Sequence, residues 1–277
     1  MPLTTIYDGG TRIVGNSTAI NEVLHPNVLS YVRLVISEGY NPSWERINAL
    51  NNLTLSLIAN GLWDKMDAMY PFIGGTTGNQ HRYNLRDPRA LTAAFMITWG
   101  GTVTFSDNGN QGNNIDGFGN TNLIPSTHVA SATSIHMSCY INIASVPAGL
   151  GRLALGASSG GVSDFGTSPS VGNRYYAQIN NSGIIDSGVA TTGFYCASRI
   201  SNTDSRLYRN GVQVGTTSAT AASASTGSIG IHARGNGSFP SNNRIAFVSI
   251  GDGLNAVEAR TLYQLVQIYQ TALGRQV

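Results

Sequence analysis

Glutamate is nearly missing from this chain of 277 residues. Its four copies are Glu22, Glu38, Glu45 and Glu258. None lies between residues 46 and 257, where glycoside hydrolysis would have to rely on scattered Asp residues instead of the usual pair of carboxylates. The five His show no metal-ligand spacing, and neither a Gly-x-Ser-x-Gly elbow nor a phosphate loop is present. These absences predict that the chain is not an enzyme.

Charged residues, cysteine and long apolar runs are also scarce. Only 11% of the residues are charged, and the net charge of +2 is too small to favour nucleic acid as a partner. Cys139 and Cys196 lie in apolar patterns and are predicted to be buried free thiols. No run approaches the roughly 20 apolar residues of a membrane helix, and the first residues lack the basic and apolar regions of a secretory signal. We therefore expect neither membrane insertion nor export by the usual route.

The residues that are abundant are typical of short strands joined by polar turns. Gly accounts for 33 residues, and Ser, Thr and Asn are frequent. From about Phe72 apolar residues recur with period two, which predicts an antiparallel β-sandwich. Asn210-Gly211 predicts a type I′ turn between two strands, because both residues tolerate positive φ. The predicted strands are 93–99, 102–106, 134–143, 152–158, 175–179, 193–199, 205–209, 212–216, 228–233 and 244–250.

Helical periodicity flanks the strands on both sides. Residues 1–71 are predicted to form a helical attachment segment, and residues 72–277 the sandwich with a closing helix. The closing helix begins after the N-cap Asn255, with Glu258 in a capping box, and ends at Gly274. The helices predicted in the first segment are 17–24, 27–38, 43–60 and 63–69.

Polar side chains of the sandwich are expected at its surface. Arg82, Arg86 and Arg89 are interpreted as loop or sheet-edge residues that pair with Asp87. His136 falls on the strand face opposite its apolar neighbours and is predicted to be exposed. Loops that carry function or form subunit contacts are predicted at 107–122, 158–173 and 219–225.

Three segments resemble parts of a known group of domains. The hairpin LYRNGVQVG (207–215) is similar to one in laminin-G-like, or concanavalin A-like, jelly rolls. The end of the chain, RIAFVSIGDGLNAVEAR (244–260) followed by LYQLVQIYQTALG (262–274), resembles the last strand and closing helix of such domains in bacteriophage structural proteins. WDKMDAMYPFIGG (63–75) followed by HRYNLRDP (81–88) resembles the leading segment of the same phage group.

The resemblance implies a virion protein, either a head fibre, a head decoration or a tail component. It further implies a homotrimer whose partners are other capsid or tail proteins, located in the virion and assembled in the host cytoplasm. The alternative is a carbohydrate-binding adhesin that recognises host-surface glycans, since the same fold serves both purposes. The two functions can coexist in one protein.

Candidate sugar-binding residues are sought among aromatic rings near amides and carboxylates. Tyr176, Tyr195 and Tyr208 are the candidates, because strand alternation turns one ring of each adjacent aromatic pair outward. A cross-strand aromatic pair is the competing interpretation of the same pattern.

Calcium is the one cofactor that the sequence leaves open. Relatives of this fold often bind it, and Asp107, Asn110 and Asp116 supply hard oxygen ligands. An ordinary turn cluster rich in Asn and Gly explains the same residues and is favoured, because their spacing does not fit an EF-hand loop. No other cofactor is expected.

Overall fold

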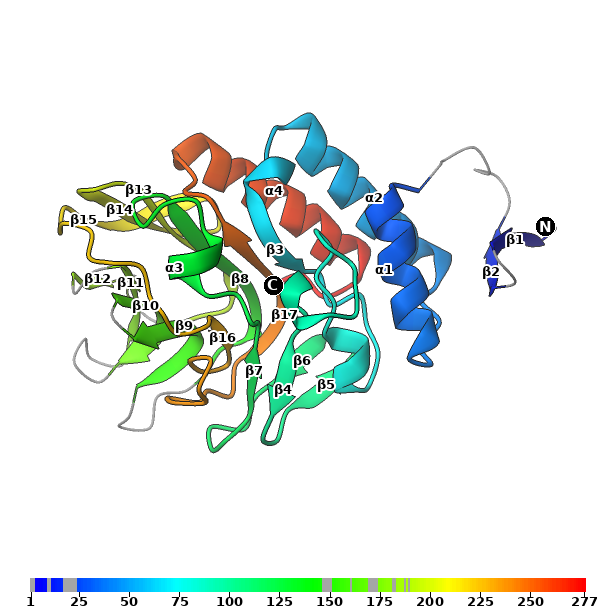
Figure 1. Ribbon diagram of the computed structural model, residues 1–277. Helices are drawn as coiled ribbons and strands as arrows, with labels where there is room; N and C mark the ends of the chain where they lie inside the picture. Colours follow the sequence, from blue (N-terminus) through cyan, green and yellow to red (C-terminus); the bar gives the residue numbers. More distant parts are fainter. Residues whose placement is uncertain are drawn as a thin grey trace.

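The computed structural model describes residues 3–8, 11–16, 24–145, 151–159, 161–168, 174–180, 183–186, 188 and 190–277. Two antiparallel sheets pack face to face, and helices cover the outer face of one of them (Figure 1). The predicted class, a β-sandwich with helices before and after it, is confirmed. The helix predicted at 17–24 lies outside the described residues apart from its last position.

The sandwich consists of a seven-stranded and an eight-stranded sheet. The first has the order β12 (Ile185–Asp186), β11 (Arg174–Ile179), β10 (Gly161–Ser168), β9 (Arg152–Ser159), β16 (Gly230–Ile231), β7 (Phe118–Asn120) and β4 (Thr98–Gly100). The second has the order β15 (Val212–Thr217), β14 (Asp204–Arg209), β13 (Gly193–Ser201), β8 (Ile135–Ile143), β17 (Arg244–Gly251), β6 (Gly109–Gln111) and β5 (Thr104–Ser106). β3 (Met66–Tyr70) also pairs with β17, while β1 (Leu3–Asp8) and β2 (Thr11–Asn16) pair with each other.

The core between the sheets follows from the predicted alternation. Ile135, Met137, Cys139 and Ile141 of β8 all face it and are buried. The opposite sheet contributes residues such as Phe165, so two apolar faces close on each other. The type I′ turn is also confirmed, with φ of 48° at Asn210 and 74° at Gly211.

A second core lies between the eight-stranded sheet and the helices. It is formed by α1 (Pro26–Ser37), α2 (Trp44–Ala59) and α4 (Ala256–Ala272) against the other face of β8, β13 and β17. Asn255 caps α4 as predicted, and Glu258 completes the capping box. The division of the chain at residue 71 stays a prediction. No helix among the described residues is long and apolar enough to span a bilayer.

Several local predictions are wrong where tertiary pairing overrides the pattern. Residues 63–69 form a 3-10 turn, η1 (Trp63–Lys65), and then β3, because the central strand β17 offers β3 a partner. In 93–99 only the end is strand, after the turn η3 (Thr92–Ala94). The predicted loops at 107–122 and 158–173 contain β6, β7 and β10, whose Gly- and Asn-rich sequences give a weak strand signal.

The helical layer also explains a wrong exposure prediction. His136 is fully buried, with Nδ1 2.6 Å from the Asp252 carbonyl oxygen and Nε2 3.0 Å from Ser249 Oγ. Its face of the sheet is covered, so strand alternation does not lead to solvent there. The predicted buried, free thiols are confirmed. Cys139 faces the core between the sheets and Cys196 the core under the helices, so they lie on opposite sides of one sheet.

The cluster of Arg residues after β3 is only partly as predicted. Arg89 pairs with Asp87. Arg82 instead pairs with Glu38 at the end of α1, at 2.7 Å. Arg86 donates to the Met66 carbonyl oxygen at 2.9 Å. Of the three, Arg82 therefore connects the end of α1 to the segment that follows β3.

Candidate functional site

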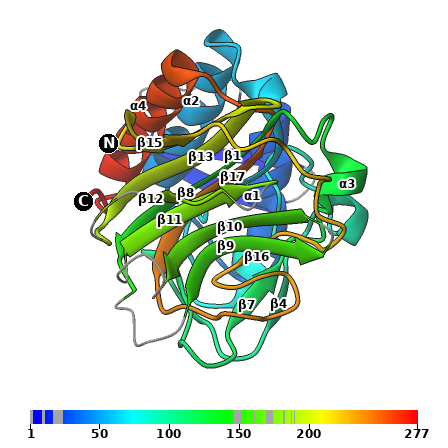
Figure 2. The same cartoon turned by 90° about the vertical axis from the view of Figure 1, so that its left-hand side faces the viewer.

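The outer face of the seven-stranded sheet has no helical cover. Figure 2 shows β9, β10 and β11 side by side with no helix in front of them. A row of directly paired residues crosses six strands of this sheet. Their chain neighbours, such as Leu155 and Phe165, point into the core, so the row points outward. The row consists of Thr98, Asn120, Gly230, Gly156, Asp164 and Gln178.

A buried ion pair stands at the middle of the row. Arg234 Nε and Nη2 donate to the two oxygens of Asp164, at 3.1 and 2.5 Å. The Asp164 side chain is only 2% exposed, and that of Arg234 is 20% exposed. Gly156 makes room for the pair, because a Cβ there would lie 2.8 Å from Asp164 Oδ1. Asp164 is therefore enclosed against the sheet, and only Arg234 of the pair is in contact with solvent.

Burial and the two hydrogen bonds from Arg234 have opposite effects on the pKa of Asp164. Burial raises the pKa of the Asp164 carboxyl, and the hydrogen bonds from Arg234 oppose that rise. The same bonds raise the pKa of Arg234, so the guanidinium keeps its charge.

Phe239 lies against this pair and is exposed. The Arg234 guanidinium carbon is 4.7 Å from the centre of the Phe239 ring, yet 45% of the Phe side chain remains accessible. From residue 24 on, no other Phe, Tyr or Trp that the structure describes is as exposed. The Phe239 backbone has φ of 62°, which is rare for a bulky residue and costs about 1–3 kcal/mol.

The loop that carries these two side chains is held by backbone hydrogen bonds. Arg234 N–H donates to the Ser238 carbonyl at 3.0 Å, and Gly237 N–H donates to the Arg234 carbonyl at 2.8 Å. Leu153 of β9 donates its N–H to the Phe239 carbonyl at 3.0 Å. The ring is thus presented from a tight turn that is anchored on the sheet.

A hollow of about 320 Å³ opens beside Arg234. A second hollow of about 440 Å³ lies next to it, with Asn79, Arg82 and Trp99 in its lining. The two adjoin, because Asn120 in the first is the direct strand partner of Thr98 in the second. The first hollow is lined by Asn120, Gly227, Ser228, Arg234, Gly235 and Asn236.

The three predicted sugar-binding tyrosines do not present an exposed ring. Tyr176 faces this outer surface but is 8% exposed, and burial followed by the nearby Asp164 charge raises its pKa. Tyr195 is packed between the sheets, with its ring centre 5.0 Å from that of Phe165. Tyr208 lies under the helices. Their predicted exposure is wrong. Both faces of the eight-stranded sheet, which carries Tyr195 and Tyr208, are covered, and the Tyr176 ring is enclosed by its neighbours on the outer face of the other sheet.

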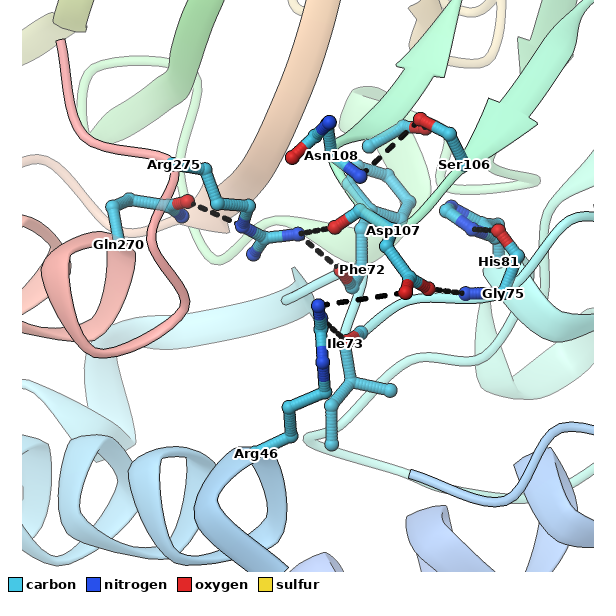
Figure 3. Close-up of polar contacts among 11 residues, drawn as sticks. Arg46, Phe72, Ile73, Gly75, His81, Ser106, Asp107, Asn108, Gln270 and Arg275 are labelled. Carbon is cyan, nitrogen blue, oxygen red and sulfur yellow. Dashed lines mark hydrogen bonds and ion pairs between the residues drawn. The ribbon is translucent and has the colours of Figure 1, made fainter. Parts of the chain in front are cut away.

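The predicted calcium ligands are engaged elsewhere and are not gathered. In Figure 3 the Asp107 carboxylate accepts from Gly75 N–H at 2.9 Å and faces Arg46 at 3.6 Å. Asn110 Oδ1 accepts from His232 Nε2 at 2.7 Å. Asp116 accepts from Thr102 N–H at 3.1 Å. Across the described part of the chain, no three His, Cys, Asp or Glu side chains are grouped as metal ligands.

Arg234, Asp164 and Phe239 were missed by the sequence reasoning. Asp164 and Arg234 are 70 positions apart, so no local pattern connects them. Phe239 stood out only weakly, as an aromatic residue in a run of Gly, Asn, Ser and Pro. An apolar ring in such a turn is the signal that could have identified it.

No protein-family model matches the chain, and no curated protein matches it either. Among solved structures, it is similar to domain 4 of AbnA, a GH43 extracellular arabinanase from Geobacillus stearothermophilus, in complex with arabinotriose. That match has a TM-score of 0.50 at 16% identity and covers 72% of this chain and 98% of the other. At this identity the similarity shows the fold alone.

Two further similar structures belong to longer chains. The Trypanosoma rangeli sialidase matches with a TM-score of 0.48 at 12% identity, over 78% of this chain but 38% of the sialidase. The binding domain of Paraclostridial Mosquitocidal Protein 1 matches with a TM-score of 0.47 at 10% identity, over 73% of this chain and 52% of the other.

These comparisons correct the prediction that the chain is not an enzyme. That prediction rested on the lack of Glu and on unmatched catalytic motifs, yet a similar structure is a domain of an arabinanase, which is an enzyme. The missing carboxylates are also a weak criterion, because not every glycoside hydrolase uses a pair of them. The absence of Glu between residues 46 and 257 therefore does not exclude catalysis.

Proposed function

We propose that this protein binds carbohydrate on the outer face of its seven-stranded sheet, over Phe239 and Arg234. The observation that carries the proposal is the exposed Phe239 ring, held at a strained backbone angle beside an anchored guanidinium. Strain of this kind persists where the surrounding structure imposes it, and it gathers at ligand sites. The similar arabinanase domain, solved with arabinotriose, supports the choice of ligand class.

The chemistry of the face suits a sugar. A saccharide offers apolar CH faces, which stack on an aromatic ring, and hydroxyls, which need donors and acceptors. Phe239 supplies the ring and Arg234 the donors. The adjoining hollow adds the amides of Asn120 and Asn236 and the hydroxyl of Ser228.

The test is isothermal titration with arabinotriose, followed by a glycan array, on the wild type and on Phe239→Gly. Gly suits the left-handed backbone, so this variant removes the ring and relieves strain. Covering one face of the ring contributes about half of the roughly 1.5–3 kcal/mol for full burial of a Phe, so Kd should rise about fourfold to tenfold.

Ile268→Ala is the matched control, since it removes an exposed apolar side chain from α4 on the helical side. It should leave Kd unchanged. A wild type that binds no glycan, or a Phe239→Gly variant that binds like the wild type, would reject the proposal.

A second candidate function is the virion role that the sequence resemblance implies. The observation that favours it is that the helical layer leaves apolar side chains exposed, Leu55 and Ile58 of α2 and Ile268 of α4. A protein partner that covered this layer would remove their apolar surface from water. Immunogold labelling of purified phage particles would test it, and particles that carry no label would reject it.

A further inference from the structure

We propose that Asp164 sets the charge preference of this face, so that its ligand is an uncharged saccharide and not a uronate. The inference rests on the proposed function and adds the class of ligand to it. It follows from how the Arg234–Asp164 pair is buried.

The pair presents a guanidinium whose charge is already matched. Both oxygens of Asp164 are occupied by Arg234, through Nε and Nη2. The carboxylate is 2% exposed, so a ligand cannot reach it. Among the described residues Arg234 Nη1 has no hydrogen-bond partner, and it is not one of the buried unpaired atoms. A ligand therefore meets the ring of Phe239 and one N–H donor group, with the negative charge directly behind.

A carboxylated sugar would gain little from this arrangement. Its carboxylate would have to give up water to reach the guanidinium, and the attraction it met there would be reduced by Asp164 directly behind, so the contact would not repay the desolvation of the carboxylate. A neutral hydroxyl accepts from Nη1 without that desolvation cost. Gly156 keeps Asp164 in place beneath the guanidinium.

The chain contains a matched pair that should not have this effect. Arg206 donates to Asp204 through the same two nitrogens, at 2.8 and 2.6 Å. That pair is on β14 of the other sheet, and its side chains are 30% and 29% exposed, so solvent screens it. Asp204→Asn is therefore the control for Asp164→Asn.

The experiment uses an array of neutral oligosaccharides, arabinotriose and galactotriose among them, and uronate counterparts such as trigalacturonate. The wild type should bind neutral members at least tenfold more tightly than uronates. Asp164→Asn leaves the Arg234 charge unmatched, and this ratio should fall by at least tenfold. Uronate binding by Asp164→Asn should weaken as the salt concentration rises from 50 to 500 mM, because salt screens the attraction between the unmatched guanidinium and the uronate. Asp204→Asn should keep the wild-type ratio.

The double variant Asp164→Asn, Arg234→Gln keeps polar partners at both positions but removes both charges. It should retain the preference for neutral sugars. This result would separate the effect of charge from that of hydrogen bonding. The double variant also keeps the inference testable if Asp164→Asn alone fails to fold. A wild type that prefers uronates, an Asp164→Asn variant with an unchanged ratio, or a double variant that binds uronates would overturn the inference alone. A wild type that binds no member of the array would overturn the proposed function with it.

Discussion

Three histidines are sealed inside the fold, and we expect them to make the protein lose stability in mild acid. His81, His136 and His232 are at most 1% exposed. Burial lowers their pKa values from 6.5 to about 4, about 4 and about 3, respectively. The folded protein thus holds each imidazole neutral at a pH where the unfolded chain protonates it.

The size of the effect follows from these pKa values. Because the folded pKa lies below the unfolded one, each His contributes stability that is complete above pH 6.5 and is lost as the pH falls toward 4. Protonation of one His stabilises the unfolded chain by about 1.36 kcal/mol for each pH unit below 6.5. At pH 5 this lowers the free energy of unfolding by about 2 kcal/mol per His. Three residues give about 6 kcal/mol, which is comparable to the whole stability of a typical domain, about 5–15 kcal/mol.

Two buried or half-buried carboxyl groups with raised pKa values, Asp164 and Asp67, act in the opposite direction. Burial, followed by the charge of Asp252, raises the pKa of Asp67 to about 6. Its neutral form therefore favours the folded state as the pH falls below 6. Asp67 is partly exposed, so solvent reduces its contribution, and the net change remains a loss of stability.

Urea unfolding at pH 7, 6 and 5 measures this loss directly. In His136→Gln the difference in unfolding free energy between pH 7 and pH 5 should shrink by about 2 kcal/mol, because one of the three protonation sites is gone. His128→Gln, at an exposed position, should leave the difference as in the wild type. Equal unfolding free energies at pH 7 and pH 5 would refute the reasoning, as would an equal effect of the two substitutions.

Two substitutions test the packing. Arg275 is 4% exposed, and its donors reach backbone carbonyls, including that of Phe72 at 2.7 Å. Arg275→Met leaves such carbonyls unpaired and should cost about 3 kcal/mol, seen by calorimetry as a fall in Tm of roughly 6–12 °C; an unchanged Tm would contradict this role. In Gly211→Ala the new Cβ would lie 2.9 Å from the Tyr263 ring, at a φ of 74°. It should lower stability by about 1–2 kcal/mol in urea, and a neutral result would contradict the type I′ geometry.

The sequence predicts those parts of the fold whose cause is local. Asn210-Gly211 fixes its turn by the conformations that two residues allow, and Asn255 with Glu258 fixes the start of α4 by a cap three residues long. β3 could not be predicted in this way. Its residues have helical spacing, and it is a strand because β17, some 180 positions later, pairs with it.

The candidate site was hidden for the same reason. Its ion pair joins β10, which the sequence assigned to a loop, to a turn 70 positions away. Strand alternation did place Tyr176 on the outer face, but it does not tell how tightly neighbouring side chains enclose the ring. The exposure of Phe239 follows from the course of the loop after β16, for which no periodic pattern exists.

The position of β17 in the eight-stranded sheet has a consequence for how this chain is made. β17 is the last strand of the sequence, yet it lies between β8 and β6 and also pairs with β3. Until residue 251 has left the ribosome, those earlier strands lack the neighbour that joins them. The middle of the sheet therefore closes only after β17 has emerged, and α4 covers it later still.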